Sequence, residues 1–287
     1  MPPVLVIARL TIQEAARRRL LLALLVLTLI VVGFSAWGFH KITTVTNSNG
    51  QVLQPVEIAL ITSQLLIVVT FMFSGVLALS AAVVAGPLIS SEVESGLLLS
   101  MLARPVRRSE VVIGKWLGLA ILVAIYAAGS AFLELVAVDW ATGYLPPHPV
   151  DLVIYVGSEG LVLLSLGLAL STRLSGITGG VIALVAWLMG WIAGVVGDIG
   201  IGLQNQAVEN VGVISHLILP SDGLWRGAIY AMEPDTLLAT MRAAGTVGRA
   251  NPFAAVDPPP VSFLLWVVVW FALMLALSIW SFRTREI

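Results

Sequence analysis

The chain has 287 residues, of which 59% are hydrophobic and only 11% are charged, and its mean hydropathy is +1.01. A soluble domain carries about 25% charged residues, so this composition excludes an ordinary water-soluble protein and indicates a chain that lies in lipid. The absence of cysteine excludes disulfides, thiolate metal sites and cysteine nucleophiles. The net charge of −1 is uninformative about nucleic acid or acidic substrates, and no nucleic-acid partner is expected.

Residues 4–19 are predicted to form a helix with a polar face, ahead of the first long apolar run. Arg9 and Arg17 on this face suit the anionic headgroups of a membrane, so we expect an N-terminal interfacial helix. The alternative is a plain extension of the first membrane helix. The apolar run that follows exceeds the hydrophobic region of about 7–15 residues in a signal peptide, so we expect it to be retained.

Six apolar segments are long enough to span a membrane, which takes about 20 residues per helix. They cover residues 20–39, 58–85, 111–138, 150–171, 176–201 and 261–282. The second is the longest and should tilt or project into water. We therefore predict an all-α integral membrane protein with six transmembrane helices, forming a single transmembrane domain over residues 1–287.

The distribution of lysine and arginine predicts that both termini lie in the cytoplasm. With that orientation the inner segments carry 11 of these residues and the outer segments carry 4, in agreement with the positive-inside rule. The inner set is Arg9, Arg17, Arg18, Arg19, Arg104, Arg107, Arg108, Lys115, Arg173, Arg283 and Arg285, and the outer set is Lys41, Arg226, Arg242 and Arg249.

The long connection over residues 202–260 then lies outside the cell. We expect it to form short amphipathic helices between the fifth and sixth membrane helices, such as those over residues 221–232 and 236–244.

The inner connection reads GPLISSEVESGLLLSMLARPVRRSEVVIGK from Gly86 to Lys115. Here Pro87 is predicted to end the second membrane helix, Ser90 or Ser91 to cap a new helix over residues 90–103, and Pro105 to stop it. The apolar residues Val93, Leu97, Leu98, Met101 and Leu102 recur in it at helical spacing. A leucine-rich helix exposed to the cytosol usually marks the site of a partner.

This segment resembles the signature of type-2 ABC (ATP-binding cassette) exporter permeases. The matching residues are Glu92, Glu94, Gly96, Leu98, Leu102, Pro105, Arg108, Glu110, Gly114 and Lys115. The resemblance implies that the region over residues 88–104 holds a coupling helix that docks into an ATPase subunit. It also implies an N-terminal interfacial helix, six membrane helices and small extracellular helices, and it therefore covers the whole chain.

The resemblance further implies two ATPase copies and a second permease copy or paralogue, in the cell membrane of a prokaryote. No phosphate-binding GxxxxGK[ST] loop occurs in the sequence, so no cofactor is expected in this chain, and ATP with Mg²⁺ should bind to the separate ATPase. No catalytic or metal-binding motif is present, and we predict a transport subunit rather than an enzyme.

Polar residues within the apolar segments are candidates for a translocation path. These are Gln64, Ser74, Glu134 and Glu159. The alternative is that the two glutamates, with Asp198, lie near lipid headgroups. None has an evident partner in the sequence, which weakly favours a lipophilic or amphipathic substrate.

Two further patterns leave their roles open. Gly190 and Gly194 form one of two Gly-x-x-x-Gly pairs of the fifth segment that permit close helix contact, either within one subunit or across a dimer. Tryptophans such as Trp187, Trp191 and Trp225 are predicted as anchors or packing residues, with an aromatic substrate wall as the alternative.

The sequence thus favours an ABC exporter permease for a drug, a lipid or a peptide-like molecule. The alternatives are a permease-like subunit for signalling or assembly, whose outer loop binds an extracytoplasmic partner, and a secondary transporter. An intramembrane enzyme is a further rival, but its polar catalytic cluster is not seen.

Overall fold

The computed structural model describes residues 2–16, 19–45, 52–94, 107–245, 248, 250–251 and 253–285. Over these residues the fold is helical and contains no β-strands, as the sequence predicts. The helices are α1 (Pro3–Ala16), α2 (Arg19–Ile42), α3 (Pro55–Ala85), α4 (Pro87–Glu94), α6 (Arg108–Thr142), α7 (Pro149–Ser171), α8 (Gly176–Gly202), α9 (Gln206–Ile218), α10 (Ser221–Met232), α11 (Asp235–Ala243) and α13 (Val261–Arg283).

Six candidate membrane spans are found among the described helices, and each is long and apolar enough to cross a bilayer. Five of them are α2, α6, α7, α8 and α13, and the remaining one joins α3 to most of α4. All six predicted membrane helices are therefore confirmed as helices, and their bounds differ from the predictions by only a few residues.

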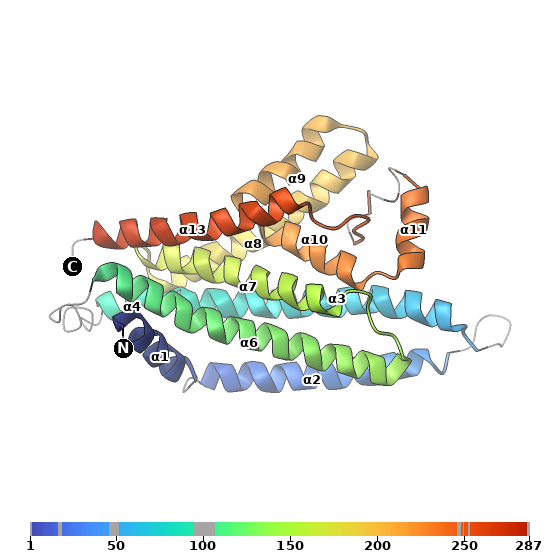
Figure 1. Cartoon of the computed structure of the whole chain (residues 1–287), viewed down its shortest axis with the longest axis horizontal. Coiled ribbons are helices and arrows are strands. Elements are labelled where there is room, and N and C mark those ends of the chain that lie inside the picture. Colours follow the sequence, from blue (N-terminus) through green and yellow to red (C-terminus); the bar gives the residue numbers. More distant parts are fainter. Residues whose placement is uncertain are drawn as a thin grey trace.

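The long helices lie side by side along the long axis of the molecule, as Figure 1 shows. Both termini lie at one end of this bundle, which we call the terminal end, and α11 lies at the opposite, distal end. Helix α7 is central, because it contacts α3, α6, α8, α10 and α13. Helices α8 and α9 pack against each other and project obliquely from the bundle.

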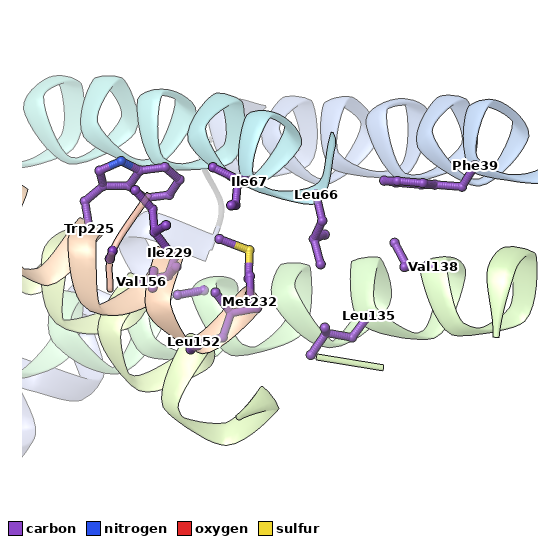
Figure 2. Packing of buried hydrophobic residues seen from close by; sticks show 14 of the residues in the cluster. Phe39, Leu66, Ile67, Leu135, Val138, Leu152, Val156, Trp225, Ile229 and Met232 are labelled. Atoms are coloured by element: carbon purple, nitrogen blue, oxygen red, sulfur yellow. The ribbon is translucent and has the colours of Figure 1, made fainter. Parts of the chain in front are cut away.

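The main hydrophobic core lies where α2, α3, α6, α7 and α10 meet. Figure 2 shows Leu66 and Ile67 of α3 facing Leu135 of α6 and Met232 of α10. Leu66 and Met232 are each 0% exposed. The short helix α10 is thus part of the core and fixes the distal ends of the long helices.

Helix α1 packs along the beginning of α6 because α6 has glycines at the contact. A Cβ atom at Gly118 would lie 2.6 Å from the main-chain oxygen of Ala8, so any side chain there would push α1 away. Ile7 and Ala8 are buried against α6, whereas Leu10 is 55% exposed. Helix α1 thus has one face on the protein and another face with apolar side chains open to the surroundings.

The connection over residues 202–260 contains a described helix whose position is not predicted from the sequence. Helix α10 has the predicted bounds, and α11 begins and ends one residue earlier than expected. The additional helix is α9, which begins after Asn205, whose side chain accepts hydrogen bonds from the backbone N–H groups of Ala207 and Val208. It folds back along α8, so this part is a helical hairpin rather than a loop.

Candidate functional site

The segment predicted to dock the ATPase begins as α4, directly after a one-residue break at Gly86. Pro87 occupies the first turn of α4, where its missing N–H group costs nothing. The hydroxyl groups of Ser90 and Ser91 donate to the carbonyl oxygens of Gly86 and Pro87, at 3.3 and 2.6 Å. The predicted serine cap is therefore wrong, because both serines lie inside a helix that starts earlier.

Lys115 of α6 joins α4 to the membrane helices. Its Nζ atom lies 2.6 Å from Oε1 of Glu92 and donates to the carbonyl oxygen of Leu88 at 2.9 Å. The side chain of Lys115 is 4% exposed and that of Glu92 is 19% exposed. A buried lysine is tolerated only when its charge is compensated, so this pair determines where α4 lies.

Arg108 of α6 binds the end of α13. Its Nη1 atom donates to the carbonyl oxygens of Phe282, Arg283 and Arg285 at 2.9–3.1 Å, and its guanidinium lies over the Phe282 ring. The last carbonyl groups of a helix lack N–H partners within it, so a side-chain donor can bind them. A cation at this position is also stabilised by the negative end of the helix dipole. The guanidinium is thus occupied within the chain.

The turn between α7 and α8 is bound to the same end of α13. Arg285 donates to the carbonyl oxygen of Thr172 at 2.7 Å, and the Thr172 and Ser281 hydroxyl groups are 2.8 Å apart. Arg173 also donates to Ser281, at 3.0 Å. The terminal end is therefore a continuous network that links α4, α6, α7 and α13.

Most of the predicted docking residues lie outside the described residues. These are Gly96, Leu98, Met101, Leu102 and Pro105. Glu94 is the last residue of α4, and only its backbone is described. Glu92 and Arg108 are the two members of the predicted set whose side chains can be placed.

The predicted path residues Ser74 and Glu159 are in contact. The Ser74 hydroxyl donates to Oε1 of Glu159 at 2.7 Å, and the Trp187 indole N–H donates to the same oxygen at 2.8 Å. Glu159 is 2% exposed, which places it between α3, α7 and α8 rather than beside lipid headgroups. Its other carboxyl oxygen has no hydrogen-bond partner among the described residues.

Glu134 lies in a second buried position, apart from Glu159. It is 2% exposed, and its Oε2 atom accepts a hydrogen bond of 2.9 Å from the Ser35 hydroxyl of α2. Gln64, on α3, has a buried Nε2 atom without a partner in the described part of the chain. The four predicted path residues therefore do not form one cluster in this protomer.

Four aromatic side chains meet on the side of Glu159. Phe71 of α3 lies with its ring centroid 6.0, 5.2 and 5.4 Å from those of Trp187, Trp191 and Trp225. Trp225 is buried, whereas the other three are half-buried, so the cluster both packs α10 and presents aromatic surface between α3 and α8.

A charged cluster that the sequence does not indicate joins α8, α9 and α10. Arg226 donates to Asp198 at 2.6 Å and to Asp222 at 2.9 Å, and His216 lies 2.8 Å from the same Asp222 oxygen. Burial alone would lower the pKa of Arg226, but the charges of Asp222 and Asp198 outweigh it and raise that pKa. Asp198 is therefore paired with Arg226, which lies 28 residues away in the sequence.

Gly194 makes room for this cluster. A Cβ atom at Gly194 would lie 1.9 Å from a carboxyl oxygen of Asp222. The neighbouring Gly190 faces Leu219 and Ser221 of the same chain. For this pair of glycines, the close contact is therefore within the subunit.

Another buried carboxyl group lies at the end of α10. Glu233 is 0% exposed and accepts a hydrogen bond from the Ala255 N–H group, and burial raises the pKa of Glu233 to about 7. Nearby, Tyr144 donates to the Met232 carbonyl oxygen at 2.7 Å, and its pKa is raised by burial and by the charges of Glu233 and Asp235.

Comparison with known proteins decides what kind of membrane protein this fold is. The family model described as "ABC-2 family transporter protein" matches residues 5–287, which is nearly the whole chain. The chain belongs to the ABC-2 family of transporter membrane proteins. It is also 28% identical, over an alignment of 306 residues that covers all of both chains, to the probable ABC transporter permease protein NosY of Pseudomonas aeruginosa.

Family membership confirms several predictions made from the sequence. The chain is an ABC-2 permease subunit with six candidate membrane spans, and it is a transport component rather than an enzyme. An ATPase partner follows from membership of the family. The secondary-transporter alternative is excluded.

Proposed function

We propose that this ABC-2 permease is the membrane-spanning subunit of an exporter and that its region over residues 88–104 receives the movement of a separate ATPase. The observation that carries the proposal is the contact of Lys115 with Glu92 and with the Leu88 carbonyl oxygen. It holds the first two turns of the predicted docking segment against α6. A displacement of α4 by the ATPase would therefore move α6 directly.

The docking contacts are proposed to come from the apolar face of that region, with carboxylates at its beginning. The residues concerned are Glu92, Glu94, Gly96, Leu98, Met101, Leu102 and Pro105. Arg108 supports the segment in a different way, because its guanidinium binds the carbonyl groups of α13. We assign it to positioning the terminal end rather than to contact with the ATPase.

The working complex is proposed to contain two permease chains, either two copies or this chain with a paralogue, and two ATPase subunits that bind ATP and Mg²⁺. The path would run beside α3 and α8, where Phe71, Trp187 and Trp191 present aromatic surface. Such a surface supports a lipophilic or amphipathic substrate, such as a drug, a lipid or a peptide-like molecule. Gln64, Ser74, Glu134 and Glu159 would supply its polar groups.

The proposed location is the cell membrane of a prokaryote, with both termini and α4 in the cytoplasm. The excess of lysine and arginine at the terminal end supports this orientation. Because the chain has no native cysteine, single cysteines at positions 5 and 56 give a direct test. A membrane-impermeant maleimide added to intact cells should label position 56 and spare position 5, and the opposite pattern would refute the orientation.

A second candidate function is assembly or signalling through an extracytoplasmic partner. The observation that favours it is a cleft of about 510 Å³ between α9, α10 and the beginning of α13. It is lined by His216, Arg226, Phe263, Trp266 and the prolines at 258–260. An open cleft with aromatic and charged walls is suited to binding a partner.

The test of the main proposal is co-purification of the permease with the ATPase encoded beside it. The wild type should retain the ATPase, and Leu98→Asp/Leu102→Asp should lose it while keeping its elution volume in detergent. The exposed pair Leu5→Asp/Leu10→Asp is the matched control and should retain the ATPase. Equal retention by all three chains would place docking elsewhere.

A further inference from the structure

A small cavity lies beside Glu134, between α3, α6 and α7. Its lining is apolar except for Thr70 of α3 and Ser130 and Glu134 of α6. The remaining lining residues are Leu66, Phe73, Ala131, Leu135, Leu152 and Val156. Its volume of about 10 Å³ is close to the least that accommodates one water molecule.

The two hydroxyl groups that line this cavity donate their protons to other groups, so they can only accept a hydrogen bond from it. Thr70 donates its hydroxyl proton to the Met232 sulfur at 3.3 Å, and Ser130 donates to the Ala127 carbonyl oxygen at 3.2 Å. The Ser35 hydroxyl lies 2.9 Å from Oε2 of Glu134 and also 2.9 Å from the Val32 carbonyl oxygen, so its one proton is shared between two acceptors. The buried Oε1 atom of Glu134 has no partner among the described residues. An ionised Glu134 would therefore find no hydrogen-bond donor for Oε1 in the cavity. A buried acceptor without a donor destabilises the fold.

Among the described residues, no positive charge compensates Glu134. Within the described ranges of the chain, no lysine, arginine or histidine forms an ion pair with it. The ionisable side chains on the neighbouring elements have other partners. Tyr126 of α6 binds Thr28, and Glu159 of α7 binds Ser74 and Trp187. Glu233 after α10 binds Ala255, and His40 of α2 stacks on Trp140. An uncompensated carboxylate inside a membrane span costs several kcal/mol at least.

A metal ion does not suit the site. Hard cations such as Mg²⁺ and Ca²⁺ take six or more oxygen ligands. The cavity offers Glu134, Thr70 and Ser130 and has room for about one water molecule. A proton needs only one acceptor, and it turns Oε1 of Glu134 into the donor that the cavity lacks.

We propose that Glu134 is a proton-binding site, carried as a neutral carboxylic acid that donates into the cavity towards Thr70, Ser130 or one water molecule between them. The carboxyl group then makes two hydrogen bonds, accepting from Ser35 and donating into the cavity. This inference does not depend on which substrate the permease carries.

The test is infrared difference spectroscopy of the full-length permease in lipid nanodiscs at neutral pH, with wild type compared to Glu134→Gln. The expected difference is loss of a carbonyl stretch of a protonated carboxyl group, one that shifts in D₂O. Glu57→Gln removes an exposed carboxyl group and is the matched control, which should lose carboxylate absorption instead. Loss of carboxylate absorption in Glu134→Gln would overturn the proposal.

A second pair of variants keeps the test decisive if Glu134→Gln fails to fold. Ser130→Ala and Thr70→Val retain Glu134 but remove acceptors from the cavity. At least one of them should shift the protonated-carboxyl band, because its hydrogen bond weakens. An unchanged band in both, or a carboxyl signal that depends on added sodium rather than on pH, would contradict the assignment.

Discussion

Lys115 and Glu92 lie 2.6 Å apart although 22 residues separate them in the sequence, and they connect the short helix α4 to the long helix α6. Lys115 and Arg108 are seven residues apart on α6 and therefore lie on one face of it. Each donates to main-chain carbonyl oxygens of another helix: Lys115 binds α4 and Arg108 binds α13. The beginning of α6 thus holds together the parts of the terminal end.

Lys115→Met should weaken coupling between the ATPase and the membrane helices. The change removes the charge that holds Glu92 and the Leu88 carbonyl oxygen, and losing one partner of a largely buried pair costs about 3–5 kcal/mol. We expect the ATPase still to co-purify but substrate-stimulated ATP hydrolysis to fall several-fold. The measurement is ATP hydrolysis by the reconstituted complex with and without substrate.

The exposed Lys41 provides the control for this prediction, because Lys41→Met removes an equal charge from the distal end. The charge exchange Lys115→Glu/Glu92→Lys should recover part of the stimulation. If the exchange recovers nothing and Lys115→Met behaves like Lys41→Met, the pair has no part in coupling.

Arg108→Gln should release the end of α13. Three carbonyl groups lose a charged donor, and hydrogen bonds to charged groups contribute about 1.5–3 kcal/mol. Trypsin should therefore cut faster after Arg283 and Arg285 in the variant than in the wild type. Arg9→Gln, at an exposed position on α1, is the control and should leave the cleavage rate unchanged. If Arg108→Gln is cut at the wild-type rate, Arg108 does not hold the end of α13.

The membrane helices could be predicted because the lengths of apolar runs are set by the bilayer. Helix α9 is harder to predict, because Gly202 and the polar residues after it are typical of a loop. Asn205 as an N-cap with Glu209 in the first turn was the available signal. The start of α4 was misplaced for a related reason, since Pro87 both ends one helix and begins the next.

The contacts of the candidate site could not be predicted, because they depend on the packing of distant segments. The pairing of Asp198 with Arg226 joins α8 to α10, and nothing in the local sequence pattern of either residue indicates the other. The Gly190 and Gly194 pattern predicted close contact but not its partner, since small residues permit contact with any helix that fits. Only the fold shows that α9 and α10 occupy that face.

Gly194→Ala should destabilise the contact of α8 with α10. The added Cβ atom would overlap a carboxyl oxygen of Asp222, which is held by Arg226 and His216, and overpacking of this kind costs about 1–3 kcal/mol. Gly129→Ala on α6 is the matched control, because no atom of another element lies within 4 Å of its Cβ position. It should be neutral or stabilising by up to about 1 kcal/mol. Thermal unfolding in detergent measures both, and equal midpoints would refute the prediction.

Glu233 should make the stability of the permease depend on pH near neutrality. Burial raises its pKa from 4.5 to about 7, so the folded protein favours the protonated form. That stabilisation is fully present below the pKa of the unfolded chain and is lost as the pH rises through about 7. The unfolding temperature of the wild type should therefore fall between mildly acidic and mildly alkaline pH.

Glu233→Gln removes the titrating group but keeps the shape of the side chain, so its unfolding temperature should change less over the same pH range. Glu57→Gln removes an exposed carboxyl group and should keep the wild-type pH dependence. Because Glu233 accepts the Ala255 N–H group and follows Met232 of the core, the loss at alkaline pH should appear first in α10 and the segment around Ala255. Hydrogen exchange at two pH values locates it, and a wild-type profile parallel to that of Glu233→Gln would show that another group titrates.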